Sequence, residues 1–270
     1  MAFPPAQSTK IAHGSQRKFA TFRAIAALML REMATRYGRS PGGYAWAILE
    51  PAGAILVLGL AMSVLVRVPP LGTSFILFFA TGFLPFIMYQ NLGGNIGRCI
   101  NFSRALLFYP AVTWVDAVMA RFFLTVLTEV FVMVVLFTAI IIITNDRSSL
   151  NLARIVEGVC LAAFLGLAIG AFNCVLFGLF EVWMQVWAIL NRPMFLMSGT
   201  FFNYEDMPAG VQSVLWYNPV VHITGLMRRG FYSTYDGAYI SVSYVMTVAT
   251  ILLFIGIVLL SRYHRVILNR

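Results

Sequence analysis

Six long apolar stretches divide the chain, and short polar or basic segments lie between them. Each stretch is close to or longer than the roughly 20 residues that an α-helix needs to cross a hydrocarbon core of about 30 Å. The pattern therefore predicts an all-α polytopic membrane protein with six transmembrane helices. Their expected limits are about 45–66, 72–93, 115–144, 152–180, 183–202 and 239–261.

A separate amphipathic segment, residues 17–39, precedes the first span. Its apolar residues recur at helical spacing: Phe19, Phe22, Ala26, Met29, Leu30, Met33 and Tyr37. Most of its basic residues lie off this stripe, and a basic amphipathic helix of this kind lies in the membrane interface rather than across it. We therefore expect an interfacial helix here, with a disordered tail before it at 1–16 and a helix-breaking SPGG sequence after it at 40–43.

The stretch 207–232 is apolar in its middle but contains Asn218-Pro219. Proline removes a backbone donor and disfavours the α conformation of the residue before it, so this run is expected to form two short helices. Neither helix is long enough to cross a bilayer, but both can enter it and return where protein shields the broken backbone. The sequence thus predicts a re-entrant hairpin between the fifth and sixth spans.

The basic residues favour one orientation of this topology. With six spans, the two termini and the 94–114 loop share one side, which holds 12 of the 19 Lys and Arg residues. The opposite side holds Arg67, Arg147, Arg154, Arg228 and Arg229. Because Lys and Arg accumulate on the cytoplasmic side, we expect cytoplasmic termini, including a short tail at 263–270, and a periplasmic hairpin.

Composition agrees with a membrane protein. Hydrophobic residues make up 60% of the chain and charged residues 11%, whereas a typical soluble domain has about 25% charged residues. The first forty residues lack the pattern of a secretory signal peptide, so the first span is expected to stay in the mature protein. We expect a single membrane domain over 17–262, in which the three cysteines act as small packing residues.

The sequence contains none of the common catalytic motifs. The phosphate-binding pattern GxxxxGK[ST] does not occur, and the only lysines are Lys10 and Lys18, so nucleotide hydrolysis would fall to another polypeptide. The histidines, His13, His222 and His264, are too scattered to suggest a metal cluster. We therefore expect a transport subunit without catalytic, cofactor-binding or metal-binding residues of its own.

Polar residues inside apolar runs are candidates for a translocation path, because they are expensive in lipid. One face of the fifth span carries Glu181, Gln185, Ala188, Arg192 and Gly199. Trp183 and Trp187 point roughly opposite, as interfacial or lipid anchors would. Two interpretations of Arg192 remain open at this point: it lines a path, or it pairs with another helix.

Further polar and aromatic residues allow both a structural and a functional interpretation. The third span carries Asp116, Arg121 and Glu129, for which interhelical pairing is favoured. Aromatic residues near the outer end could stack on sugar rings or form an ordinary interfacial belt: Phe201, Phe202, Tyr204, Trp216 and Tyr217. His222 follows the Asn-Pro break and is a structural residue or part of the path.

Several segments resemble ABC-2 type permeases, over roughly residues 17–262. They are RYGRSPGGYAWAILEP (36–51), ATGFLPFIMY (80–89), NFSRALLFYPAVTWVDAVMAR (101–121), RPMFLMSGTFF (192–202) and LWYNPVVHITGLMRRGF (215–231). The last two segments are similar to the capsular polysaccharide export permeases of Gram-negative bacteria, which are multi-pass proteins of the inner membrane.

The resemblance implies specific partners and roles. The permease would form a homodimer and work with two copies of a cytoplasmic ABC ATPase, which would bind ATP and Mg. Arg98, Arg104 and Phe108 in the 94–114 loop would contact that ATPase. The 17–39 helix, with Arg31, Arg36 and Tyr37, would act as a gate.

The same resemblance implies the rest of the export route. A lipid-linked and usually acidic polysaccharide would be the substrate. It would pass on to a periplasmic co-polymerase-type protein and an outer-membrane channel, and no nucleic acid would be involved.

The sequence leaves three alternatives to this function. The nearest is an ABC-2 exporter of another polymer, such as O-antigen or teichoic acid. A proton-coupled secondary transporter would need buried acids and an internal repeat, and Glu129 is the only deep acid. A membrane-embedded glycosyltransferase would need paired cytosolic carboxylates, which do not stand out in the sequence. A Walker-A ATPase encoded beside this chain would favour the exporter.

Overall fold

The computed structural model describes residues 20–37, 43, 45–66, 68–109, 112–144 and 150–270, and the regular elements in those ranges are all helices. The tail expected at 1–16 lies outside the described residues. The elements are α1 (Ala20–Tyr37), α2 (Ala45–Leu65), α3 (Phe75–Gly97), α4 (Cys99–Leu107), α5 (Trp114–Thr144), α6 (Leu152–Leu179), α7 (Trp183–Leu196), the 3₁₀ turn η1 (Tyr204–Asp206), α8 (Ala209–Leu215), α9 (Pro219–Phe231) and α10 (Val242–Asn269). The all-α prediction is confirmed for these residues.

Five helices within the described ranges are long and apolar enough to cross a bilayer. They are Ala45–Val64, Phe75–Leu107, Trp114–Thr144, Leu152–Leu179 and Val242–Asn269. They correspond to the first four predicted spans and the sixth. The second runs on through most of the expected 94–114 loop, because α4 follows α3 with a break only at Arg98. The last helix reaches Asn269, so most of the expected tail at 263–270 is helical.

The fifth predicted span is shorter than expected. The helix predicted over 183–202 ends at Leu196, after 14 residues, so its predicted end is wrong. The chain then turns through Gly199, whose φ of 79° is a conformation that residues with a side chain rarely adopt. The buried hydroxyls of Ser198 and Thr200 lie 2.6 Å apart on either side of this glycine. This compact turn takes the place of the last part of the predicted span.

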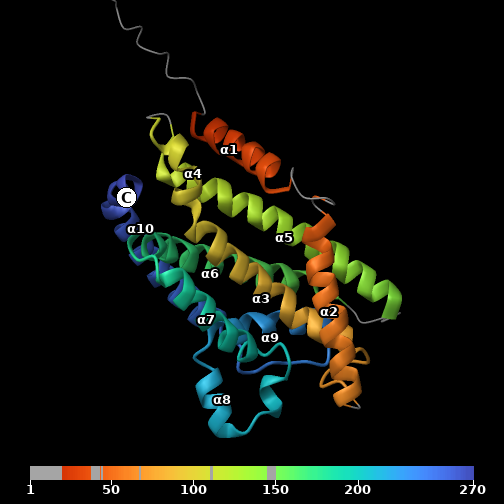
Figure 1. Cartoon of the computed structure of the whole chain (residues 1–270). Helices are drawn as coiled ribbons and strands as arrows, with labels where there is room; N and C mark the ends of the chain where they lie inside the picture. The colour runs from red at the N-terminus through yellow and green to blue at the C-terminus, as the bar shows by residue number, and fades with distance from the viewer. Residues whose placement is uncertain (1–19, 38–42, 44, 67, 110–111, 145–149) are drawn as a thin grey trace, which may run out of the picture.

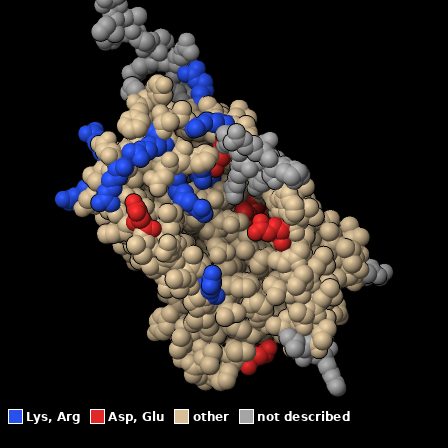
Figure 2. Space-filling view, in the orientation of Figure 1, with Lys and Arg blue, Asp and Glu red and all other residues tan. Residues whose placement is uncertain are grey.

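The helices are arranged so that α1, α4 and the C-terminal end of α10 gather at one end of the molecule, whereas α8 lies at the opposite end (Figure 1). α4 packs against both α5 and α10. Basic side chains are concentrated at the α1 and α4 end (Figure 2). The two ends of the molecule therefore differ in both charge and architecture.

The core forms where α6 packs between α3 and α10. A Cβ atom at Gly166 or Gly170 would lie 2.6 Å from the Cβ of Leu92 or Ile96, respectively. Both neighbours are completely buried. Small residues at such positions let helices approach closely in membrane proteins, so this contact fixes the position of α3 against α6.

The predicted break at Asn218-Pro219 separates α8 from α9. The Asn218 side chain accepts a hydrogen bond of 3.1 Å from the Val220 N–H and so caps α9, with Pro219 at its first position. Its amide nitrogen donates to the carbonyl of Met197, 2.9 Å away. The same residue thus begins one helix and holds the turn that follows α7.

Arg228 joins this turn to α9 and α3. It was expected on the outer side with other basic residues, but its side chain is almost fully buried. Its guanidinium donates to the carbonyls of Phe202 at 2.8 Å and Thr200 at 3.4 Å. The guanidinium carbon lies 4.0 Å from the centroid of the Phe78 ring. A buried cation therefore holds the end of the α7 turn in place.

Candidate functional site

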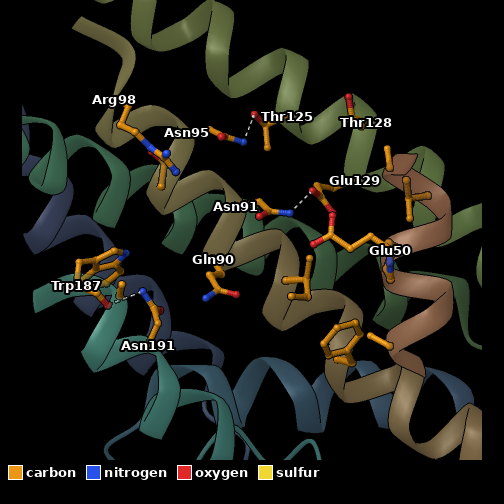
Figure 3. A pocket seen from close by; sticks show the side chains of 18 of the residues that line it. Glu50, Gln90, Asn91, Asn95, Arg98, Thr125, Thr128, Glu129, Trp187 and Asn191 are labelled. Atoms are coloured by element: carbon orange, nitrogen blue, oxygen red, sulfur yellow. Dashed lines mark hydrogen bonds between the residues drawn. The ribbon is translucent and has the colours of Figure 1, made fainter. Parts of the chain in front are cut away.

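A cavity of about 580 Å³ opens between α2, α3, α5 and α7 (Figure 3). All four helices are rich in apolar residues, yet many side chains lining this cavity are polar. They are Glu50, Gln90, Asn91, Asn95, Arg98, Thr125, Thr128, Glu129, Trp187 and Asn191. Polar residues within apolar helices usually face an interior or an aqueous path, so this cavity is the candidate functional site.

The α3 wall carries a continuous polar stripe. Gln90, Asn91, Asn95 and Arg98 are spaced by one, three or four residues, which places them on one face of the helix. The neighbouring face, which includes Leu92, packs against α6 as described above. Close packing on one side therefore turns the polar stripe toward the cavity.

Two carboxylates lie on the walls contributed by α2 and α5. The Asn91 amide donates a hydrogen bond of 2.7 Å to Glu129. Glu50 extends from α2 toward the same part of the cavity (Figure 3). The Asn95 amide also reaches α5, at 3.4 Å from the hydroxyl of Thr125. These contacts join α3 to α5 and leave the carboxylates facing the cavity.

α7 completes the site with an indole and an amide. The Asn191 amide nitrogen donates to the carbonyl of Trp187 at 3.0 Å. The Nε1 atom of Trp187 and the Oδ1 atom of Asn191 are buried, and neither has a hydrogen-bond partner among the described residues. Buried polar groups normally have partners, so this donor and this acceptor are two unsatisfied groups within the α7 wall of the cavity.

The lining has a definite chemical character. Amides and hydroxyls both donate and accept hydrogen bonds, carboxylates accept them, and the Trp187 indole adds a flat apolar surface. In the described residues, no group of His, Cys, Asp and Glu is suited to hold a metal ion. The cavity therefore suits a ligand rich in hydroxyl groups.

The path residues predicted on the fifth span lie elsewhere. Glu181, Gln185 and Arg192 are exposed on the surface of the single chain, and none of them lines the cavity. The prediction that Trp183 and Trp187 act as interfacial or lipid anchors is wrong. The Trp183 indole donates to Asn173 of α6 at 3.1 Å, and Trp187 lines the cavity, because α7 turns its indoles toward the protein.

Of the outer candidates, Phe202, Tyr204 and Trp216 belong to an aromatic cluster at the α8–α9 hairpin, whereas Phe201 packs against Phe79 and Phe195 in the main core. Tyr204 is buried and stacks on Tyr239 with ring centroids 3.9 Å apart. The Trp216 indole donates to the Tyr239 carbonyl at 3.3 Å. Tyr217 differs from them, with 71% of its surface exposed. Of these tyrosines and tryptophans, Tyr217 is thus the one placed to meet a ligand on the surface.

His222 is buried within this cluster, with both ring nitrogens engaged. Its Nδ1 atom accepts from the Ser241 N–H at 3.2 Å, so Nε2 carries the hydrogen that is donated to the Trp216 carbonyl at 2.8 Å. Burial lowers the pKa of His222, which favours the neutral ring. The contacts give His222 a structural role in joining the hairpin to the start of α10.

The residues expected to contact an ATPase separate into two groups. Arg98 lines the cavity and bonds to the carbonyl of Gly94 at 3.2 Å. Arg104 and Phe108 are exposed on or beside α4. On the expected gate helix, Arg31 is exposed, whereas the side chains of Arg36 and Tyr37 lie outside the described residues.

The charged residues of the third predicted span have different partners. Arg121 forms an ion pair with Glu32 of α1 at 2.9 Å, which confirms interhelical pairing for this residue. Asp116 instead accepts from the N–H and the hydroxyl of Thr113, both at 2.8 Å, at the beginning of α5. Glu129 bonds to α3, so it also contributes to interhelical contact.

Sequence reasoning missed the amide residues of the cavity. Gln90, Asn91 and Asn95 stand in an apolar run but carry no charge, so they are less conspicuous there than Glu129 or Arg192. Their spacing along the helix, which places them on the same face as Arg98, was the pattern from which a polar lining could have been predicted. Asn191 precedes Arg192 by one residue and therefore points to a different side of α7.

The sequence of this chain is similar to those of known membrane transport proteins. The ABC-2 type transporter family matches residues 23–232. The polysialic acid transport protein KpsM of Escherichia coli is 30% identical over 236 residues, which cover 87% of this chain and 91% of KpsM. The capsule polysaccharide export inner-membrane proteins CtrC of Neisseria meningitidis serogroup B and BexB of Haemophilus influenzae are 28% and 25% identical, each covering 90% of this chain and 92% of the relative.

Proposed function

Since the chain belongs to the ABC-2 type transporter family, we propose that it is the membrane-spanning subunit of an exporter that moves capsular polysaccharide across the inner membrane. The relatives named as polysialic acid and capsule polysaccharide export proteins support this choice of substrate. The substrate is expected to be lipid-terminated and acidic. It passes on to a periplasmic co-polymerase-type protein and an outer-membrane channel.

The observation that carries the proposal is the polar cavity among apolar helices. A sugar polymer presents hydroxyl groups that donate and accept, and the amides of Gln90, Asn91 and Asn95 can do both. Its C–H faces suit an aromatic surface such as Trp187. The cavity is bounded by helices of one chain, and a second copy facing it would enclose this polar lining. We therefore place the path inside a homodimer.

ATP hydrolysis belongs to a separate subunit in this proposal. The sequence lacks a phosphate-binding loop, and ATP with Mg would be bound by two copies of a cytoplasmic ATPase. α4 carries the exposed Arg104 and is followed by the exposed Phe108, at the basic end of the molecule. We assign this end to the cytoplasm, and α4 to contact with the ATPase.

The membrane topology follows from the same assignment. α7 supplies the sixth crossing although it is short, so both termini are cytoplasmic. α1 lies in the cytoplasmic interface, with Phe22 and Leu30 exposed for contact with lipid. α8 and α9 form a periplasmic re-entrant hairpin.

Deletion of the gene in the source organism tests the function. We expect capsular polysaccharide to disappear from the cell surface and to accumulate inside the cell, with both effects reversed by the intact gene. Surface staining and fractionation of the polymer measure this. Normal surface capsule in the deletion strain would overturn the proposal, as would loss of a different surface polymer alone.

A further inference from the structure

We propose that Arg121 is the positioning residue through which movement of α4 reaches the polar wall of the cavity. The inference rests on the proposed function, because it takes α4 as the helix that contacts the ATPase. Arg121 lies on α5 and has contacts to three other helices: α1, α3 and α4.

The contact with α1 is a buried ion pair. Arg121 Nε lies 2.9 Å from an oxygen of Glu32, and both side chains are 8% exposed. Among the α1 side chains that the structure describes, only Glu32 and Leu28 are buried. Removing one partner of a buried ion pair strongly destabilises a protein, so this pair helps to fix α1 against α5.

The contact with α4 is made through an aromatic ring. The guanidinium carbon of Arg121 lies 4.3 Å from the centroid of the Phe102 ring, within the range of a cation–π interaction. Arg31 of α1 lies on the same ring at 6.0 Å. Displacement of α4 would move Phe102 and therefore change the surroundings of both arginines.

The contact with α3 leads directly to the cavity. Arg121 Nη1 donates to the backbone carbonyl of Asn95 at 3.2 Å. The side chain of Asn95 lines the cavity and bonds to Thr125, which also lines it. One guanidinium thus touches the proposed ATPase-binding helix on one side and the backbone of the cavity wall on the other.

Arginine suits this position because its planar group presents several donors at fixed angles and also stacks on aromatic rings. A lysine ammonium could pair with Glu32, but it lacks the planar group whose separate nitrogens reach Glu32 and Asn95 while its face lies on Phe102. If Phe102 moves with α4, Arg121 must move with it or lose these contacts. Movement of α4 would therefore be transmitted to α1 and to the Asn95 segment of α3 together.

The test measures coupling between ATP hydrolysis and export in the complete complex. Inside-out membrane vesicles containing the permease and its ATPase are given ATP and the radiolabelled capsular polymer of the source organism. The readout is polymer taken up per ATP hydrolysed, which does not depend on how much complex reaches the membrane. A merely structural role would lower the amount of complex but leave this ratio unchanged.

Two variants distinguish a coupling role of Arg121 from a purely structural one. Arg121→Lys retains the charge that Glu32 needs, and we expect polymer per ATP to fall at least threefold. The double variant Glu32→Leu with Arg121→Met removes both charges at similar volume, a change that buried ion pairs often tolerate. We expect the double variant to hydrolyse ATP at no less than half the wild-type rate and to export less than a tenth of the polymer per ATP.

Arg154→Gln is the matched control, because Arg154 forms an ion pair of 2.8 Å with Glu157 on an exposed part of α6. It should leave the ratio unchanged. A wild-type ratio in both Arg121→Lys and the double variant would overturn the coupling role. If wild-type vesicles take up no polymer, the proposed function itself fails, which is a different result.

Discussion

Asn91 donates a hydrogen bond of 2.7 Å to Glu129 across 38 residues of sequence, and this bond ties α3 to α5 within an apolar part of the protein. The pair faces a cavity rather than lipid. Its position explains how a strongly polar contact can exist there, because the carboxylate lines the cavity and does not face lipid.

Substitution of Glu129 tests this contact. Glu129→Gln keeps an acceptor for Asn91 and should lower the free energy of unfolding by less than about 1 kcal/mol. Glu129→Leu leaves the Asn91 amide without this acceptor and should lower it by about 1–3 kcal/mol. Thermal unfolding of the purified protein measures both. Equal melting temperatures for the two variants would contradict the contact.

Accessibility to a water-soluble thiol reagent distinguishes the cavity from the lipid-facing surface. The starting protein has Cys99, Cys160 and Cys174 replaced. We expect Asn91→Cys to react, because the cavity is polar and open. Phe254→Cys is the control: this α10 side chain is 68% exposed but expected in lipid, where the reagent does not enter. Rapid labelling of the control with no labelling at Asn91 would refute the assignment.

Arg192 remains a candidate for the path in a homodimer, since it is exposed on α7 beside the cavity residue Asn191. Arg192→Gln should abolish surface polysaccharide while the permease stays at normal levels in the membrane, and Arg192→Lys should retain part of it. Surface staining and immunoblotting measure the two effects. Normal capsule display from a well-expressed Arg192→Gln variant would exclude this role.

The buried ring of His222 should make the free energy of unfolding depend on pH. Burial lowers its pKa, so the folded protein favours the neutral ring more than the unfolded chain does. This contribution is present above the unfolded pKa of about 6.5 and is lost as pH falls below it toward the folded pKa. The melting temperature should therefore fall between pH 7 and pH 5. His222→Gln should reduce that slope, and an unchanged slope would contradict the prediction.

Gly170 and Gly53 form a matched pair for helix packing. A Cβ atom at Gly170 would lie 2.6 Å from that of Ile96, whereas one at Gly53 meets nothing within 4 Å. Gly170→Ala should destabilise the protein by about 1–3 kcal/mol through overpacking. Gly53→Ala should be neutral or stabilise it by up to about 1 kcal/mol, because alanine favours the helix. Thermal unfolding compares them, and equal losses would argue against tight α3–α6 packing.

Long apolar runs made most of the fold predictable. α2, α3, α5, α6 and α10 each coincide with most of an apolar run that is long enough to cross a bilayer, although α3 and α10 extend beyond their runs. The Asn218-Pro219 break follows from proline chemistry alone. The end of α7 was not predictable in this way. It depends on a turn held by Asn218 and Arg228, which are distant in sequence.

The site was less predictable than the fold because much of its polar lining consists of neutral amides. A charged residue is conspicuous in an apolar run. Gln90 and Asn91 become conspicuous only when one notices that they lie on the same helical face as Arg98. The orientation of α7 was a second obstacle. Trp187 faces inward because its neighbour Trp183 bonds to Asn173 of α6, and this partner cannot be inferred from the α7 sequence.

The short length of α7 has a consequence for the surrounding lipid. Its 14 residues extend roughly 21 Å, against a hydrocarbon thickness of about 30 Å. Such hydrophobic mismatch is relieved when the bilayer thins locally or when protein fills the difference. Beside α7, the leaflets would then approach each other, and a lipid-anchored polymer leaving there would cross a shorter apolar distance than elsewhere in the membrane.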